Sequence, residues 1–384
     1  MLWISLAGFL TTLAFSLQIA ALPDYLSASF VDVRQSGIAI AAFSAGIVIA
    51  RMFGLSWLDK PIETRAIGVG TAFAAVGIMC ILAASPTYVI WVGRFLFGVG
   101  NAIVLAILAG VASRWSKHDR DTANDIAQFY SATAVALVAG PPLGLLASSA
   151  VGFAAVPALS LACSIIVALT LVARREILRP RLLRPEDYRP SAFRPDRLRL
   201  QVLTLGALTA APVGVFETIF PYLANDVGID RIFVVYLAFA ISNVFGRAIS
   251  ARPIFAANMR TWAALGVLEC AVSFAVVCWH GRGLPIWTIA MLAAGAGLGL
   301  SAQLLTNRLA TLSPRVERAR SLSVLVLAFY FVFAASSVLG GTAYAVGQGL
   351  PLLAIAIFML ALSAAIYVTP FNKTGSTAMD VEPS

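Results

Sequence analysis

Long apolar runs, separated by short stretches with charged residues, prolines or glycines, dominate this chain of 384 residues. The runs are continuous over about 20 residues instead of alternating with a period of two, so they predict helices long enough to cross a bilayer. Backbone in lipid must satisfy its own hydrogen bonds, and this leaves only helices or a closed barrel, of which the pattern favours helices. We predict twelve spanning helices, at residues 2–22, 36–57, 66–84, 88–113, 122–146, 153–173, 200–223, 231–251, 260–280, 284–306, 320–345 and 350–369.

The composition supports an all-α integral membrane protein. Hydrophobic residues make up 60% of the chain and charged residues 12%, whereas an ordinary soluble domain carries about 25% charged residues. The net charge is +9, but the basic residues lie in short stretches between apolar runs. This is the positive-inside pattern of a membrane protein and not a nucleic-acid-binding surface, so we expect no nucleic-acid partner.

One polar segment divides the helices into two sets of six. Residues 174–199 hold nine arginines and four prolines, and we interpret them as a cytoplasmic connector between an N-terminal bundle at 1–173 and a C-terminal bundle at 200–369. A short polar tail follows at 370–384, and we expect it to be cytoplasmic. The opposite side would hold only Arg34, Arg231 and Arg282, while the connector's side would also hold Lys60, Arg65, Arg114, Lys117, Arg120, Arg252, Arg260, Arg315, Arg318 and Arg320.

The two sets of helices carry matching residues at a nearly constant offset, which indicates a duplicated six-helix unit. The matches are Ala42-Phe43 with Ala238-Phe239, Arg51 with Arg247 and Ile90-Trp91 with Ile286-Trp287 at an offset of 196, Phe129-Tyr130 with Phe329-Tyr330 and Gly140 with Gly340 at 200, and Pro23 with Pro221.

The start of the chain and its cysteines both fit membrane helices. Residues 2–22 lack the basic region of a signal peptide and are followed by many spans, so we interpret them as the first helix. No Lys or Arg precedes that helix, so either the start codon is misassigned or neighbouring helices orient it. The four cysteines, Cys80, Cys163, Cys270 and Cys278, lie in apolar runs without metal-ligand spacing to histidine, and we expect no disulfide, metal or cofactor.

Three segments carry unusual residues. Arg94 precedes Gly98 and Gly100 in the fourth run. Burying an arginine at the bilayer centre costs at least ~2.5 kcal/mol, so we expect Arg94 to face a partner or a water-filled cavity. The alternative is that its side chain snorkels to the membrane interface. Gly140, Pro141 and Gly144 in the fifth run predict a kinked, closely packed helix. The loop after the second run contains Arg51, Asp59, Lys60 and Arg65.

These segments resemble three motifs of the major facilitator superfamily, and the span count, the connector and the repeat resemble its architecture. The arginine motif has Phe97 in place of the family's common Gln, and the antiporter-associated Gly-Pro motif ends on Leu145 in place of Gly. The loop motif keeps the Arg-to-Asp spacing but has Leu55 and Ile62 at its glycine positions. The resemblance implies a proton-coupling role for Arg94 and a cytoplasmic latch around Asp59, for which ordinary solvated loop charges are the alternative.

Acidic residues within the runs are the candidates for carrying protons. A carboxyl group removed from water binds a proton more readily, and a proton-coupled cycle requires this. Glu217 stands one turn before Pro221 in the seventh run, which lines the central cavity in the family, so we favour Glu217 as the carrier. We expect Glu269 in the ninth run to make an interhelical hydrogen bond, and Asp24 to lie at the interface.

Other polar side chains in the runs could contact substrate or bond to a neighbouring helix. They are Gln18, Asn101, Gln128, Tyr130, Asn243, Gln303, Asn307 and Tyr330. We find no arrangement of nucleophile, base or metal ligands and expect no enzyme activity.

The resemblance therefore implies a secondary transporter of two six-helix bundles that opens alternately to each side. We hypothesise proton-coupled efflux of a small molecule by a monomer in the bacterial cytoplasmic (inner) membrane, with protons, substrate and membrane lipid as its partners. The alternatives left open are an importer or uniporter of the same fold and a non-transporting sensor or membrane enzyme.

Overall fold

The computed structural model describes residues 1–29, 31–54, 63–83, 87–113, 119–173, 195–250, 252–280, 283–313 and 318–369. Within these ranges all regular structure is helical, and twelve helical segments are long and apolar enough to cross a membrane. The expected all-α membrane fold with twelve spans is confirmed. The Arg-rich connector and the C-terminal tail lie almost wholly outside the described ranges.

The first six spans are each one helix, and they lie within a few residues of the predicted runs. They are α1 Leu2–Ala28, α2 Val33–Gly54, α3 Glu63–Ala83, α4 Thr87–Ser113, α5 Asp119–Val151 and α6 Ala155–Ala173. The helix α1 continues six residues past its predicted end at residue 22, because Pro23 is accommodated inside it. Likewise Pro141 and Pro142 lie inside α5, so the kink-prone segment does not end that helix.

The second set contains eight helices, because one span is interrupted and one short helix is added. They are α7 Arg197–Leu208, α8 Ala211–Val227, α9 Ile232–Ile249, α10 Pro253–Ala257, α11 Met259–His280, α12 Leu284–Leu312, α13 Arg318–Val346 and α14 Leu350–Val368. The seventh span was predicted as one helix, but it breaks at Thr209 and Ala210. Pro212 lies in the first turn of α8 and has no amide hydrogen, and the Thr209 hydroxyl donates to the Gly206 carbonyl at 2.6 Å, so each half is satisfied locally.

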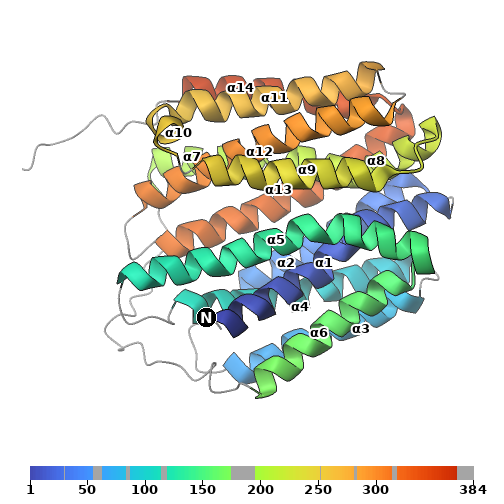
Figure 1. Cartoon of the computed structure of the whole chain (residues 1–384), viewed down its shortest axis with the longest axis vertical. Helices are drawn as coiled ribbons and strands as arrows, with labels where there is room; N and C mark the ends of the chain where they lie inside the picture. Colours follow the sequence, from blue (N-terminus) through green and yellow to red (C-terminus); the bar gives the residue numbers. More distant parts are fainter. Residues whose placement is uncertain are drawn as a thin grey trace, which may run out of the picture.

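The helices form two bundles lying side by side, α1–α6 below and α7–α14 above in Figure 1. Within the first bundle α1 packs on α5 and α6, and α4 packs on α2 and α3. Within the second bundle α12 packs on α9 and α11, and α11 also packs on α14. The bundles meet where α2 contacts α13, α5 contacts α9 and α1 contacts α8.

Close glycine contacts follow the duplicated pattern. A Cβ atom on Gly98 of α4 would collide with the backbone carbonyl of Phe43 on α2, and one on Gly295 of α12 would collide with that of Phe239 on α9. The second bundle therefore repeats the backbone contact of the first. Backbones can approach this closely only where a residue has no side chain. Such close packing matters in a membrane, because lipid offers little hydrophobic drive for helix association.

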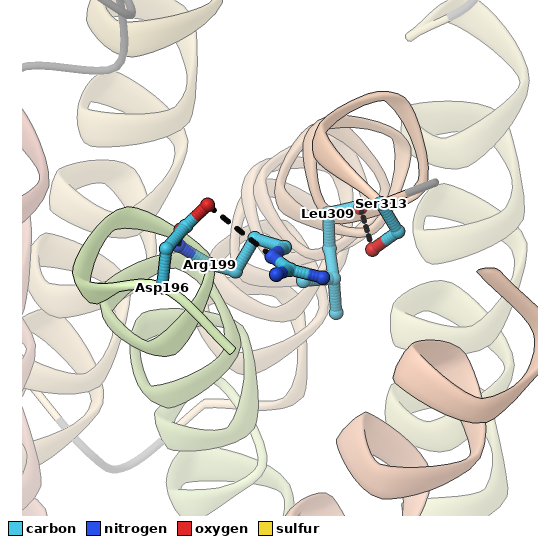
Figure 2. A network of polar contacts seen from close by, with 4 residues as sticks. All are labelled: Asp196, Arg199, Leu309 and Ser313. Carbon is cyan, nitrogen blue, oxygen red and sulfur yellow. Dashed lines mark hydrogen bonds and ion pairs between the residues drawn. The ribbon is translucent and has the colours of Figure 1, made fainter. Parts of the chain in front are cut away.

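The start of α7 is held at the end of the molecule where the connector joins it, which we call the connector end (left in Figure 1). The side chain of Asp196 caps α7 by accepting from the Arg199 amide at 2.8 Å, and its carboxylate lies 3.4 Å from Arg199 Nε. Figure 2 shows the Arg199 guanidinium directed toward the last turn of α12, where the Ser313 hydroxyl donates to the Leu309 carbonyl at 2.7 Å. A cation near the C-terminus of a helix is favourable, so this placement stabilises the packing of α7 on α12.

Candidate functional site

Arg94 lies inside the protein and not at the membrane interface. Its side chain is 2% exposed, its Nη1 donates to Gln18 Oε1 of α1 at 3.2 Å, and its guanidinium lies 4.7 Å from the centre of the Phe43 ring of α2. The Phe43 ring is itself stacked on Phe15 at 4.1 Å. The snorkelling alternative is therefore wrong, and the guanidinium faces partners from two neighbouring helices, as a charge in the membrane requires.

Glu217 brings the opposite charge from the other bundle. It lies on α8, is 8% exposed, and is within electrostatic range of Arg94, Tyr236 and Tyr330. Both Arg94 and Glu217 are described, and no ion pair within 4.0 Å and no hydrogen bond joins them. The structure thus brings together the two residues expected to couple protons, one from each bundle, without letting them touch.

A row of polar contacts closes the bundle interface at the end away from the connector. The Tyr222 hydroxyl of α8 donates to the Val31 carbonyl at 3.1 Å, and Asn225 Nδ2 donates to Ser27 Oγ at 2.6 Å. We call these four residues the seal. Just behind it, Asp226 accepts from Gln348 Nε2 at 2.8 Å and from the Tyr344 hydroxyl, which ties the end of α8 to α13.

The depth of Gln18 and Glu217 in the bundle interface can be measured from the seal. Both α1 and α8 end at the seal, and Gln18 lies nine residues before Ser27 while Glu217 lies eight before Asn225. At 1.5 Å per residue both side chains lie about 12–14 Å from the seal, near the middle of their spans. The Gln18–Arg94 pair and Glu217 therefore occupy one level, facing each other across the bundle interface.

Helix α13 completes this level from the second bundle. Tyr330 packs against an apolar cluster of the first bundle that includes Phe15, Phe43 and Ile47, and it lies within electrostatic range of Arg51 at the connector end of α2. Further toward the seal, Phe333 packs with Ile40, and the backbones of α2 and α13 approach closely at Gly37 and Gly341. Contacts between the bundles thus run from mid-span to the seal.

The remaining polar residues from the predicted substrate cavity are less central. Asn101 Nδ2 donates to the Thr11 carbonyl at 3.0 Å, and Asn243 Nδ2 donates to the Gly295 carbonyl at 3.3 Å while its Oδ1 accepts from Arg247 Nε at 3.0 Å. Gln303 Nε2 donates to Asn307 Oδ1 at 2.9 Å on α12. Asn101 and Asn243 therefore join neighbouring helices within their bundles. Gln128 is exposed on α5, and the side chain of Tyr130 lies outside the described part.

The glycines of the two helix motifs lie at helix crossings. Gly98 meets α2, Gly100 meets α3 at Gly70, and Gly140 and Gly144 meet α1 at Ser16 and Leu17. The Ser16 hydroxyl also donates across this crossing, to the Ala136 carbonyl of α5 at 2.8 Å. A larger side chain at Gly144 would meet the Leu17 backbone, which cannot rotate away. The motif of α5 therefore presses that helix against α1, the helix that carries Gln18.

Of the predicted latch, Arg51 is half-buried at the end of α2, whereas Asp59 and Lys60 lie outside the described residues, as does the side chain of Arg65. The expectation for Glu269 is not met. Its side chain is exposed at the middle of α11, and no hydrogen bond from its carboxyl group to another described residue is found. Asp24 is half-buried near the end of α1.

The sequence did not point to two tyrosines, one at the central level and one at the seal. Tyr236 of α9 is 2% exposed, packs its ring 4.6 Å from Phe216 and lies within electrostatic range of Glu217, and Tyr222 bridges the bundles at the seal. Neither belongs to a motif of the chain. A tyrosine in an apolar run gives the same signal whether it points to lipid, core or interface.

A family model described as Major Facilitator Superfamily matches residues 4–334 of the chain. The chain belongs to this superfamily. It is accordingly a transporter of a small molecule across a membrane and not an enzyme. No curated protein matches it in sequence.

Solved structures of other superfamily transporters have the same fold. Two are titled as a POT family transporter, in complex with a thioalcohol-conjugated peptide and with 5-aminolevulinic acid, at TM-scores of 0.75 with 13% and 12% identity over 95% of both chains. A third, a point mutant of the nucleoside transporter NupG, has a TM-score of 0.73 and 10% identity over 95% of this chain and 97% of that one. At such low identity these likenesses establish the fold alone.

Proposed function

We propose that this superfamily member exports a small molecule in exchange for protons by alternating access, with Glu217 as the proton carrier and Arg94 as its coupling partner. The observation that carries the proposal is the placement of Arg94 and Glu217: each is almost fully buried, they come from opposite bundles, and no ion pair within 4.0 Å joins them. Rocking of the bundles changes their separation, so the charge state of Glu217 and the conformation are linked.

The direction of transport follows from sidedness. The one-sided distribution of basic loops supports a connector end and a C-terminus on the cytoplasmic side of a bacterial inner membrane. With this orientation the seal would lie on the outer side, and we propose that the described conformation is closed outward and receives substrate from the cytoplasm. Packing of Gly140 and Gly144 against α1 supports an antiporter, since the motif resembles that of exporters.

The remaining roles complete the cycle. Gln18 and Tyr330 flank the charged pair and are the best placed of the proposed substrate contacts, with Gln128, Asn243, Gln303 and Asn307 as further candidates on the paths to it. Arg51, Asp59, Lys60 and Arg65 would hold the cytoplasmic side when the seal opens. We propose that the transporter works as a monomer.

The test uses purified protein in proteoliposomes with an internal pH indicator and a panel of candidate small molecules. We expect an imposed proton gradient to drive accumulation of a substrate against its own gradient, with proton movement in the opposite direction, and a protonophore to abolish the accumulation. Uptake that continues at the same rate after the proton gradient is dissipated would favour an importer or uniporter and end the exchange proposal.

A further inference from the structure

Several donor atoms at the central level have no hydrogen-bond partner within the described protein. They include Arg94 Nε and Gln18 Nε2, whose residues are 2% and 0% exposed. The Tyr236 hydroxyl is in the same position. Buried donors in native proteins are almost always paired, and leaving one unpaired costs about 1–3 kcal/mol, so a group of them calls for further partners, either water or a bound ligand.

The donors on the first bundle favour a carboxylate. Arg94 uses Nη1 on Gln18 Oε1, and this leaves its Nε and the amide nitrogen of Gln18 without a partner among the described residues. A guanidinium fork binds the two oxygens of a carboxylate in bidentate fashion, and such charge-assisted bonds are the strongest of their kind. The Phe43 face stacks against the guanidinium from another side, so the spare donors are held in one orientation.

The acceptor on the second bundle favours a cation. The Glu217 carboxylate makes no hydrogen bond to a described residue, and an ionised carboxylate can only accept. Arg94 is too far away to pair with it directly. A protonated amine would supply both the hydrogen bonds and the charge that this carboxylate lacks.

We infer that the substrate of this transporter is an organic zwitterion, whose carboxylate binds Arg94 and Gln18 and whose ammonium group binds Glu217 across the bundle interface. The inference rests on the proposed function in that it assigns a substrate class to the same site. A zwitterion joins the bundles through both charges, whereas a molecule with one charge leaves the other buried charge unpaired.

The inference also accounts for exchange. When the ammonium group binds the ionised Glu217, the proton that Glu217 carried leaves to the solution, and the ligand's amine keeps its own proton. Substrate and proton then occupy Glu217 in turn. Because each excludes the other from Glu217, their movements are coupled in opposite directions.

Binding is tested without any gradient, so that the result is independent of proton coupling. The full chain in lipid nanodiscs is titrated at one pH with α- and ω-amino acids of different chain lengths, each accompanied by its methyl ester, which carries only the cation, and its N-acetyl derivative, which carries only the anion. We expect at least one amino acid to bind, and both of its derivatives to bind at least tenfold more weakly. Equal binding of either derivative, or no binding of any amino acid, would overturn the inference.

Variants separate the two ends of the ligand. Glu217→Gln should weaken the amino acid and its ester at least tenfold and leave the N-acetyl derivative unchanged, whereas Gln18→Met should weaken the amino acid and the N-acetyl derivative and leave the ester unchanged. Glu269→Gln, on the outer face of the same bundle, should change none of them. A uniform loss for all three ligands in both site variants would mean a structural role only and would refute the assignment. Proton-driven exchange of some other solute, with no zwitterion bound, would refute the substrate class and leave the proposed function standing.

Discussion

The interface between the bundles and the outer face of the second bundle each hold a mid-span carboxyl group. Glu217 is 8% exposed and lies opposite a buried arginine, whereas Glu269 is exposed among apolar side chains of α11 such as Leu265 and Val272. Both residues are acidic and both lie in apolar helices, and only the resemblance to the family separated them in the sequence. The difference teaches that position in a span does not decide whether an intramembrane carboxyl group is buried opposite a charged partner or exposed without one.

The most direct way to break this comparison is to neutralise each carboxyl group in turn. In Glu217→Gln we expect proton-driven transport to fall at least tenfold, to the background of empty liposomes, because the mid-span carboxyl group at the interface can no longer exchange a proton. In Glu269→Gln we expect transport within twofold of the parent, measured in the same proteoliposome assay. Loss of proton-driven transport in both variants would show that the exposed face of α11 also takes part in transport.

A second pair of substitutions compares close packing at a helix crossing with an open surface. Gly144→Ala places a methyl group against the Leu17 backbone, and overpacking of this kind costs about 1–3 kcal/mol. Gly68→Ala on α3 meets nothing within 4 Å and should stabilise its helix by up to about 1 kcal/mol. Thermal unfolding in detergent should therefore show a lower midpoint for the first variant and an equal or higher midpoint for the second. A midpoint for Gly144→Ala at or above that of the parent would contradict the crossing.

The smallest effect is expected at the seal. Asn225→Ala removes one hydrogen bond between the bundles, worth about 0.5–1.5 kcal/mol, and should raise the population open at this end by roughly two- to tenfold. Fluorescent labels at Ser29 and Gly228 in a cysteine-free background would report the separation. Ser149→Ala removes an exposed bond within α5 and serves as the control. If the two variants give the same distribution of distances, the seal does not bias the equilibrium.

Much of the fold was predictable from the sequence because the bilayer imposes a length and a polarity on every span. The helix count and the two sets of six followed from apolar runs and from the placement of arginines. The break at Thr209 and Ala210 was not predicted, since Pro212 and Thr209 look like ordinary span residues until the hydrogen bonds are known. The predicted end of α1 also came six residues too early, because a proline inside a membrane helix need not end it.

The candidate site was predictable only in part. Arg94 and Glu217 stand out because charges in lipid are costly, and Gln18 was recognised as one polar group among several. Which of these groups share a level depends on how α1, α4 and α8 pack, and no local pattern reports that. Asn101 and Asn243 gave the same signal as Gln18, yet each donates to a backbone carbonyl of a neighbouring helix, whereas Gln18 accepts from the Arg94 side chain.

The interruption of the seventh span separates α8 from α7, so a tilt of α8 would turn about Ala210. Glu217 lies seven residues beyond that pivot and Asn225 fifteen, distances of about 10 Å and 22 Å along the helix axis. Any tilt of α8 about this point therefore displaces the tip roughly twice as far as the carboxylate. A tilt of α8 that opens the seal would therefore move Glu217 only about half as far as Asn225.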